Sequence, residues 1–240
     1  MVAGDKQSGQ QRIETIRLIK DSFGYSASVY GQILVFFIPS LVISILTGLS
    51  AAEGSAGTTL LLILVTYACV IPYSGGASIF YVHQNLTQQG ATVADSMQKA
   101  TERFSQLVLA TVLVYTSLLV GFLCLIVPGI YLSIRLSFVI YAVVIENRSA
   151  TDALSRSWIL TKGYWWQIFL ALIALFFPLG VVSGLLGSIA GDNIFFSSII
   201  GGLAAMFMGP ISAIYYVFVF MSLVNLAARS SPLAKSSLPV

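Results

Sequence analysis

The residues that raise a chemical question are an arginine and two serines inside apolar segments. Arg135 lies in the run PGIYLSIRLSFVIYAVVIENRSATDALSRSW, residues 128–158, six residues after Gly129. A charged side chain at the centre of a membrane span costs about 2.5–3.5 kcal/mol on insertion scales. Such residues usually pair with another group, reach the interface or line a site. Arg135 is therefore the first candidate for a functional role.

The sequence leaves three interpretations of Arg135 open. Its long side chain could reach the outer headgroups, or bond carbonyls left free by prolines of neighbouring spans, or hold an anionic ligand or lipid phosphate. In the third interpretation Ser74, in PYSGGAS, and Ser212, in GPIS, would contribute to the same site. Paired helix breaks in corresponding spans mark binding sites in transporters. Glycine and proline in membrane helices also have a simple packing role, because small residues let helices approach closely.

Patterns for catalysis or metal binding are missing from the sequence. The chain has one histidine, His83, and two cysteines, Cys69 and Cys124, both inside apolar segments. No nucleophile with a base, no metal-ligand spacing and no Gly-rich phosphate loop is present. We therefore expect no enzyme activity, no metal and no cofactor. The net charge of +3 reflects where the basic residues lie between spans, so we do not expect nucleic acid as a partner.

The composition predicts an all-α integral membrane protein. Hydrophobic residues make up 57% of the 240 residues and charged residues only 9%, whereas soluble domains carry about 25% charged residues. A helix needs about 20 apolar residues to cross the hydrocarbon and satisfies its own backbone polar groups there. Six segments meet this requirement, near residues 30–50, 58–83, 105–127, 129–146, 165–189 and 195–226. We expect a tight outer hairpin turn at Pro128-Gly129 between the third and fourth spans.

The basic residues predict the orientation of these spans. Eleven of the twelve lysines and arginines lie on one side of a six-span topology, and the opposite connections contain only Glu53 and Asp192 as charged residues. Lysine and arginine mark the cytoplasmic side. We expect a multi-pass protein of the cell membrane with both termini in the cytoplasm. Residues 1–11 and 227–240 would be flexible cytoplasmic tails flanking a membrane domain at 12–226.

The membrane domain is predicted to contain three repeats, at about 12–84, 92–146 and 149–226. Each repeat would consist of an interfacial amphipathic helix followed by a transmembrane hairpin. In the third repeat Ser149 can cap the interfacial helix with Asp152 as its partner, and Gly163 can end it. Residues of the first repeat recur 139 positions later: Gly24, Pro39 and Gly48 correspond to Gly163, Pro178 and Gly187.

Two runs carry a family resemblance. They are PGIYLSIRLSF, residues 128–138, and ENRSATDALSRSWILTKG, residues 146–163, which includes Glu146, Arg148, Ser149, Asp152, Arg156 and Gly163. Together they resemble the membrane domain attached to some bacterial glycerophosphodiester phosphodiesterases, and its stand-alone multi-span relatives. The resemblance implies a membrane domain of poorly defined role whose signature is the cytoplasmic helix at 146–163. The hydrolase of the fused proteins is a separate soluble barrel, so its activity does not carry over.

Two functions from different classes follow as expectations. The first is a non-enzymatic membrane module that binds membrane lipids or a protein partner. The second is a small transporter or lipid-handling protein with a site formed by Arg135, Ser74 and Ser212. The direction of Arg135 separates them: a wet cavity shared with the two serines favours transport, whereas headgroups or a carbonyl favour the module.

Overall fold

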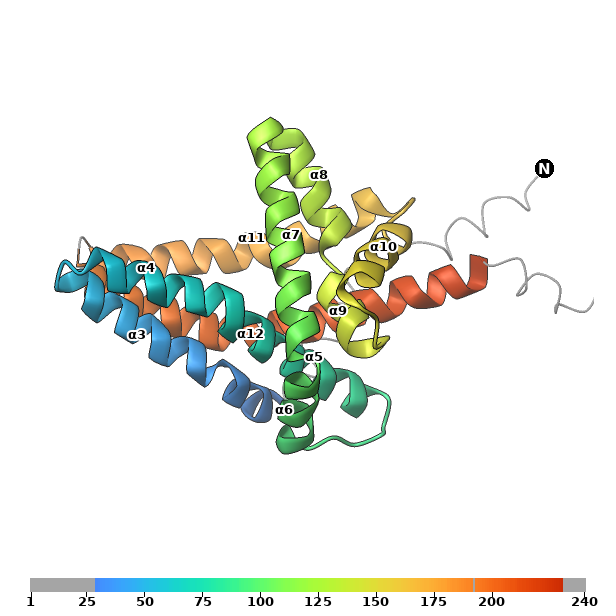
Figure 1. Cartoon of the computed structure of the whole chain (residues 1–240), viewed down its shortest axis with the longest axis horizontal. Helices are drawn as coiled ribbons and strands as arrows, with labels where there is room; N and C mark the ends of the chain where they lie inside the picture. The colour runs from blue at the N-terminus through green and yellow to red at the C-terminus, as the bar shows by residue number, and fades with distance from the viewer. Residues whose placement is uncertain (1–28, 192, 231–240) are drawn as a thin grey trace, which may run out of the picture.

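A computed structural model describes residues 29–191 and 193–230 (Figure 1). The predicted first interfacial helix and the tail at 1–11 lie outside these residues, as does most of the tail at 227–240. The described part is helical and contains no strand. Six of its helical segments are long and apolar enough to span a membrane, namely Val29–Ala52, Ala56–Leu86, Phe104–Cys124, Ile126–Ile145, Trp165–Ser188 and Ile194–Ala228. The prediction of an all-α multi-pass membrane protein is confirmed.

Several of these segments are interrupted. The first contains a 3₁₀ turn, η1 (Val35–Phe37), before α3 (Ile38–Ala52). The second consists of α4 (Ala56–Val65), a π-helical turn η2 (Thr66–Val70) and α5 (Ile71–Leu86). The remaining helices are α6 (Val93–Glu102), α7 (Phe104–Cys124), α8 (Ile126–Leu136), α9 (Val139–Ile145), α10 (Ala150–Leu160), α11 (Trp165–Ala190) and α12 (Ile194–Ser230).

Helices α3, α4, α11 and α12 run side by side as a bundle (Figure 1). The pair α3 and α12 has the most extensive contact of any two elements. Glycines make this approach possible: a Cβ added at Gly48 would lie 2.6 Å from the Ser198 Cβ, and one at Gly202 would lie 2.8 Å from the Ser44 Cβ. Small residues at helix interfaces allow close backbone packing in membranes.

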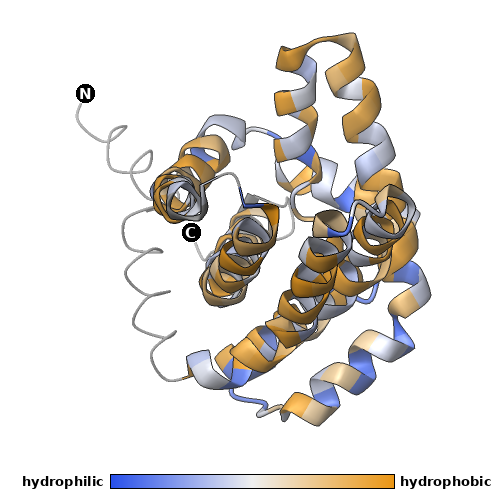
Figure 2. Cartoon of the chain, turned by 90° about the vertical axis from the view of Figure 1, so that its left-hand side faces the viewer, coloured by the Kyte–Doolittle hydropathy of each residue, from blue (hydrophilic) through white to orange (hydrophobic). Residues whose placement is uncertain are grey.

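The α7–α8 hairpin projects away from this bundle instead of running along it (Figures 1 and 2). The chain turns at Leu125, which is extended with φ −172°, and α8 begins at Ile126. The predicted turn at Pro128-Gly129 is therefore wrong by about one helical turn. Pro128 lies at the start of α8, where its missing N–H costs no helical hydrogen bond. Gly129 packs against the Phe122 ring and lets the two helices approach.

The hairpin tip, residues 123–127, is apolar and exposed. The exposed fractions there range from 69% at Ile126 to 77% at Leu123. Cys124 in the tip is an exposed free thiol. The turn after α3 is different, because it contains Glu53, Gly54 and Ser55. Only the latter turn has the polar residues expected of a connection in water.

The core lies where α5, α9 and α12 meet. Phe138, Tyr215 and Phe220 are its largest fully buried side chains. The Tyr215 hydroxyl donates a 2.8 Å hydrogen bond to the Ala171 carbonyl, which joins α12 to α11. Hydrophobic residues also cover the outside of the bundle and hairpin, whereas hydrophilic residues concentrate in α6 and the connections (Figure 2). This distribution fits a protein surrounded by lipid.

The predicted duplication stays a prediction. Two short helices, α6 and α10, do precede the third and fifth spans. The matched positions differ in their surroundings, however. Gly48 is pressed against Ser198, whereas a Cβ at Gly187 would meet nothing within 4 Å. Pro39 lies at the start of α3, whereas Pro178 lies inside α11.

Candidate functional site around Arg135

Helix α10 is the element on which the site is built. The Ser149 hydroxyl accepts a hydrogen bond from the Asp152 backbone N–H at 3.2 Å and donates one to its Oδ2 at 2.6 Å. The predicted cap is confirmed, and Asp152 reciprocates through the serine hydroxyl. At the other end Gly163 has φ +86°, a left-handed conformation that suits glycine. Gly163 thus follows the end of α10 as predicted.

A three-residue ion cluster pins α10 to the end of α9. The Glu146 carboxylate accepts hydrogen bonds from Arg156 Nη2 at 2.8 Å and from Arg148 Nε at 2.6 Å. The side chains of Glu146 and Arg156 are only 17% and 23% exposed. Burial raises the pKa of Glu146, but the hydrogen bonds and charges of Arg156 and Arg148 outweigh burial and hold the pKa below its ordinary value. The structure thus brings three of the predicted motif residues, Glu146, Arg148 and Arg156, into direct contact.

The fourth span breaks between α8 and α9, and Ser157 of α10 bridges the break. The Ser157 hydroxyl is fully buried; it donates to the Arg135 carbonyl at 2.7 Å and accepts from the Phe138 N–H at 3.3 Å. These bonds satisfy backbone groups that the break would otherwise leave unpaired inside the protein. The role of Ser157 could not be predicted, because nothing in the sequence marks the break.

The Arg135 guanidinium is held entirely by neutral groups. Its Nε and Nη2 donate to the Tyr131 hydroxyl at 2.9 and 2.7 Å, and its Nη1 donates to the Trp158 carbonyl at 3.2 Å and to Thr161 Oγ1 at 3.3 Å. The guanidinium carbon also lies 5.1 and 5.0 Å from the ring centroids of Tyr131 and Trp158, in cation–π range. Because a guanidinium has five N–H donors, one Nη2 hydrogen is not used by these bonds.

These contacts exclude the first interpretation of Arg135 and match part of the second. The side chain does not point to the outer turn, because it reaches the C-terminal turn of α10, the predicted cytoplasmic helix. The fourth span breaks after Leu136, and Arg135 just before the break contacts α10. The second interpretation expected a backbone carbonyl as partner, and Arg135 does bond one, that of Trp158. This carbonyl lies in the last turn of α10, however, and no proline has freed it. Tyr131 was detectable in principle, since it precedes Arg135 by four residues on the same helix face.

An aromatic groove opens beside Arg135, between α8 and the start of α11. Its volume is about 500 Å³, and its lining is Val127, Ile130, Tyr131, Trp165, Trp166 and Phe169. Tyr131 stacks on Trp165 with ring centroids 6.0 Å apart, and Trp165 Nε1 donates to the Tyr131 carbonyl at 3.4 Å. Through Ile130 and Phe169 this groove, called the aromatic groove below, continues along α11 into a second one of about 430 Å³.

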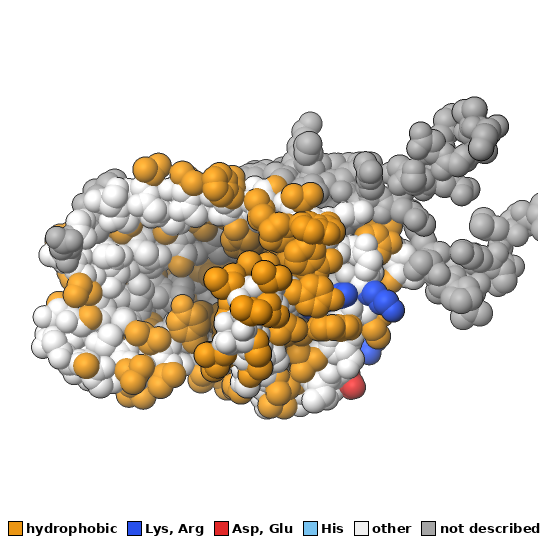
Figure 3. Space-filling model, turned by 90° about the horizontal axis from the view of Figure 1, so that it is seen from above, with side chains coloured by type: hydrophobic (Ala, Val, Ile, Leu, Met, Phe, Trp, Pro, Cys, Tyr) orange, Lys and Arg blue, Asp and Glu red, His pale blue; other side chains and the backbone are white. Residues whose placement is uncertain are grey.

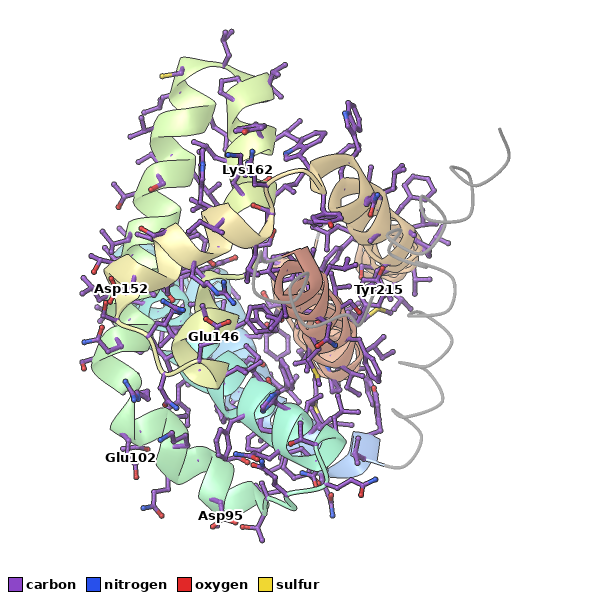
Figure 4. All side chains as sticks on the ribbon, turned by 90° about the vertical axis from the view of Figure 1, so that its right-hand side faces the viewer. Asp95, Glu102, Glu146, Asp152, Lys162 and Tyr215 are labelled. Atoms are coloured by element: carbon purple, nitrogen blue, oxygen red, sulfur yellow. The ribbon has the colours of Figure 1, made fainter. Side chains whose placement is uncertain are left out.

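Lys162 adds a second positive charge at the same end of α10. It is exposed and follows Thr161, which bonds Arg135. Figure 4 shows Lys162 at the end of α10 that faces the α7–α8 hairpin, whereas Glu146 and Asp152 lie toward its start. In Figure 3 basic side chains gather beside a broad hydrophobic surface. In the described part of the chain, ion pairs involve Lys99, Arg148 and Arg156 and do not include Arg135.

Ser74 and Ser212 lie elsewhere. Both line a chamber between α5 and α12, and Arg135 is not in its lining. The structure therefore brings the two serines together, as predicted, but separates them from the arginine.

Comparison with known proteins places this chain in a family. The model described as "Domain of unknown function (DUF7847)" matches residues 103–231, more than half of the chain. The chain belongs to this family. The matched region begins just before α7 and contains the whole Arg135 site. No curated protein and no solved structure matches the chain. The resemblance to the glycerophosphodiesterase membrane domain stays a prediction.

Proposed function

We propose that this protein is a non-enzymatic lipid-binding module of the cell membrane, in which Arg135 and Lys162 receive the phosphate of an anionic lipid. The observation that carries the proposal is the guanidinium of Arg135, whose partners are all neutral. It lies between the rings of Tyr131 and Trp158, and Tyr131 also lines the aromatic groove.

The charge balance supports an anion at this position. The C-terminal turn of α10 offers a partial negative charge that favours a nearby cation, typically by 0.3–1 kcal/mol. This is less than the 1.5–3 kcal/mol of a hydrogen bond to a charged group. A phosphate oxygen could take the remaining Nη2 hydrogen of Arg135 and the ammonium of Lys162 together. Such charge-assisted bonds are the usual means of phosphate recognition.

The aromatic groove supports a lipid as the source of the phosphate. Trp166 is 68% exposed and lies at the start of α11. Tryptophan and tyrosine favour the membrane interface, where one end of the ring is apolar and the other is wet. An acyl chain could leave the headgroup at Arg135 and lie along α11 through Ile130 and Phe169. A free phosphate would leave this apolar surface uncovered.

Membrane lipids are thus the proposed partners. We also propose that both termini lie in the cytoplasm, which the distribution of basic residues supports under the positive-inside rule. A transporter site built from Arg135, Ser74 and Ser212 is not part of the proposal, because the three residues do not share a cavity. The proposal is compatible with the resemblance to the glycerophosphodiesterase membrane domain.

The test is native mass spectrometry of the purified protein with dioleoylphosphatidylglycerol, with dioleoylphosphatidylcholine as the zwitterionic comparison. We expect one retained phosphatidylglycerol in the wild type. Loss of a charge-assisted hydrogen bond of 1.5–3 kcal/mol predicts roughly tenfold to hundredfold weaker retention in Arg135→Gln. Lys162→Gln, which alters an exposed side chain, should weaken retention without affecting the fold.

Arg103→Gln is the matched control. Arg103 also lies near α10, where its Nη1 donates to the Asn147 carbonyl at 3.4 Å, but it does not line the aromatic groove. The control should retain phosphatidylglycerol like the wild type. Equal retention in all four proteins, or equal binding of both lipids by the wild type, would refute the proposal.

A further inference from the structure

A cleft runs between the π-helical turn η2 and α11, and residues of α3 and α12 complete its lining. Its volume is about 580 Å³, and its lining includes Ser44, Thr66, Tyr67, Phe176, Gly180 and Gly201. Figure 3 shows the molecule hollowed at its left-hand end, where α3, α4, α11 and α12 lie in Figure 1. Tyr67 is 51% exposed and Phe176 is 43% exposed, so the cleft opens sideways, toward the lipid that surrounds the bundle.

The cleft leads to an inner chamber of about 190 Å³ between α5 and α12. The two spaces share Phe37, Ser40, Ile71, Gly209 and Ser212. The chamber adds Ser74, Ser78 and the aromatic rings of Tyr141 and Tyr216. A lipid of the bilayer could thus place its body in the cleft and its head in the chamber.

The lining is neutral and includes a buried hydroxyl that has no hydrogen-bond partner. No lysine, arginine, histidine, aspartate or glutamate lines either space. Two neighbouring hydroxyls bond carbonyls of the preceding helical turn: Thr66 donates to the Leu62 carbonyl at 2.7 Å and Ser212 to the Gly209 carbonyl at 2.8 Å. The Ser74 hydroxyl is different. Its residue is 3% exposed and its oxygen has no hydrogen-bond partner.

An unpaired buried hydroxyl is costly, so it indicates an occupant. The cost of leaving such a group unsatisfied is about 1–3 kcal/mol, and buried polar groups in proteins are nearly always bonded. The wall of the cleft is also irregular here, because the π-helical turn η2 contributes Thr66 and Tyr67. Such turns occur frequently at functional sites.

We propose that the cleft and inner chamber bind an uncharged lipid whose head carries a carbonyl or hydroxyl oxygen, and that this oxygen bonds the Ser74 hydroxyl. A charged headgroup is excluded, because an unpaired buried charge costs far more than a buried hydroxyl. The proposal is independent of the lipid-phosphate site, since neither space includes Arg135 or Lys162.

The test measures one-to-one binding of two short-chain probes to the protein in lipid nanodiscs. Decylubiquinone presents ring carbonyls, and dioctanoylglycerol presents a hydroxyl and ester carbonyls. Gly180→Leu should block the cleft, because a Cβ at Gly180 meets nothing within 4 Å and the side chain extends into the space. We expect at least tenfold weaker binding. Gly201→Leu blocks the same space from α12.

Ser74→Ala tests recognition of the oxygen without filling the chamber. Loss of a neutral hydrogen bond predicts roughly twofold to twelvefold weaker binding. Two controls match these changes. Gly184→Leu alters the same helix outside the lining, and Ser222→Ala removes a hydroxyl of α12 that donates to the Phe218 carbonyl at 2.9 Å. Both should bind like the wild type.

The outcomes are distinct. Binding of either probe that Gly180→Leu and Ser74→Ala weaken supports the proposal, and the probe that binds identifies the head. Binding of neither probe overturns it, as does binding that Gly180→Leu or Ser74→Ala leaves unchanged. Arg135→Gln should not alter binding of these probes, so failure here is distinguishable from failure of the lipid-phosphate proposal.

Discussion

Removal of the Glu146 charge should release α10 from α9. In Glu146→Gln, Arg148 and Arg156 both lose their carboxylate partner. The loss for Arg156 dominates the effect on stability. The Arg156 side chain is 23% exposed, and it donates to Glu146 through Nε at 2.9 Å and Nη2 at 2.8 Å. Removing one partner of a buried pair is costly because the other charge stays buried. The neutral amide keeps one acceptor oxygen and the side-chain shape.

The magnitude follows from these contacts. A hydrogen bond between charged groups contributes about 1.5–3 kcal/mol. Arg148 is 41% exposed, so its bond with Glu146 is screened by water and contributes little. The expected loss is about 2 kcal/mol, or roughly a 30-fold increase in the opening of α10. The fold as a whole should persist, because α10 also keeps its Ser157 bonds to the break in the fourth span.

Hydrogen exchange of the α10 amides in nanodiscs measures this opening. Glu102→Gln is the control: Glu102 is 51% exposed and pairs with Lys99 at 3.4 Å, so its loss should leave α10 unchanged. If the α10 amides of Glu146→Gln exchange at the same rate as those of the wild type, the reasoning is refuted. An equal increase in both variants would also refute it, because the effect would then reflect net charge alone.

The same contact predicts a pH dependence. The native pKa of Glu146 is held below its ordinary value of 4.5. A lowered carboxyl pKa contributes stability that is complete above the unfolded pKa and is lost as pH falls through the native value. After correction for intrinsic exchange rates, wild-type α10 should therefore lose protection below pH 4.5. Glu146→Gln should show no such loss, because it has no carboxylate to protonate.

Two further changes test the turns. Gly163→Ala should destabilise the protein by about 1–2 kcal/mol, because Gly163 has φ +86° and a side chain with a Cβ is strained in that conformation even where there is room for it. Gly184→Ala is the control: Gly184 lies in a helix with open space around it, so this change should stabilise the protein by about 0.4–1 kcal/mol. Equal effects of the two changes on the unfolding midpoint in a denaturant titration would contradict the left-handed stop. Because the tip of the α7–α8 hairpin has no polar side chain, we expect it to stay in the hydrocarbon. In a Cys69→Ala background, Cys124 should therefore not react with a membrane-impermeant maleimide added on either side of the membrane. Labelling from outside would show that the hairpin crosses.

The features that could be predicted depend on short-range chemistry. The caps at Thr92 and Ser149 and the stop at Gly163 involve residues three or fewer positions from the helix end they serve. Spans follow from composition, because a bilayer admits little other than apolar helices. The cluster of Glu146 and Arg156 was detectable in the same way, as opposite charges close together in one polar segment.

The partners of Arg135 could not be predicted, because they depend on the break in the fourth span. Trp158 and Thr161 follow Arg135 by 23 and 26 residues, and a straight fourth span would carry Arg135 away from them. No proline or glycine marks the break, whose backbone is satisfied by Ser157 from another helix. The direction of the α7–α8 hairpin is a consequence of the same break.

The family match helps to separate the two proposed sites. Residues 103–231 include α8, α10 and α11, and so every residue of the Arg135 site. They include only part of the cleft and inner chamber, because α3, η2 and Ser74 precede residue 103. The phosphate site consists of residues from helices that all lie within the matched region, so it can form from that region alone. The cleft and inner chamber need both halves of the chain, since Ser74 and Ser212 both line the chamber. We therefore expect the lipid-phosphate site to be the property that the family pattern describes, and the occupant of the cleft to be set by residues that precede the matched region.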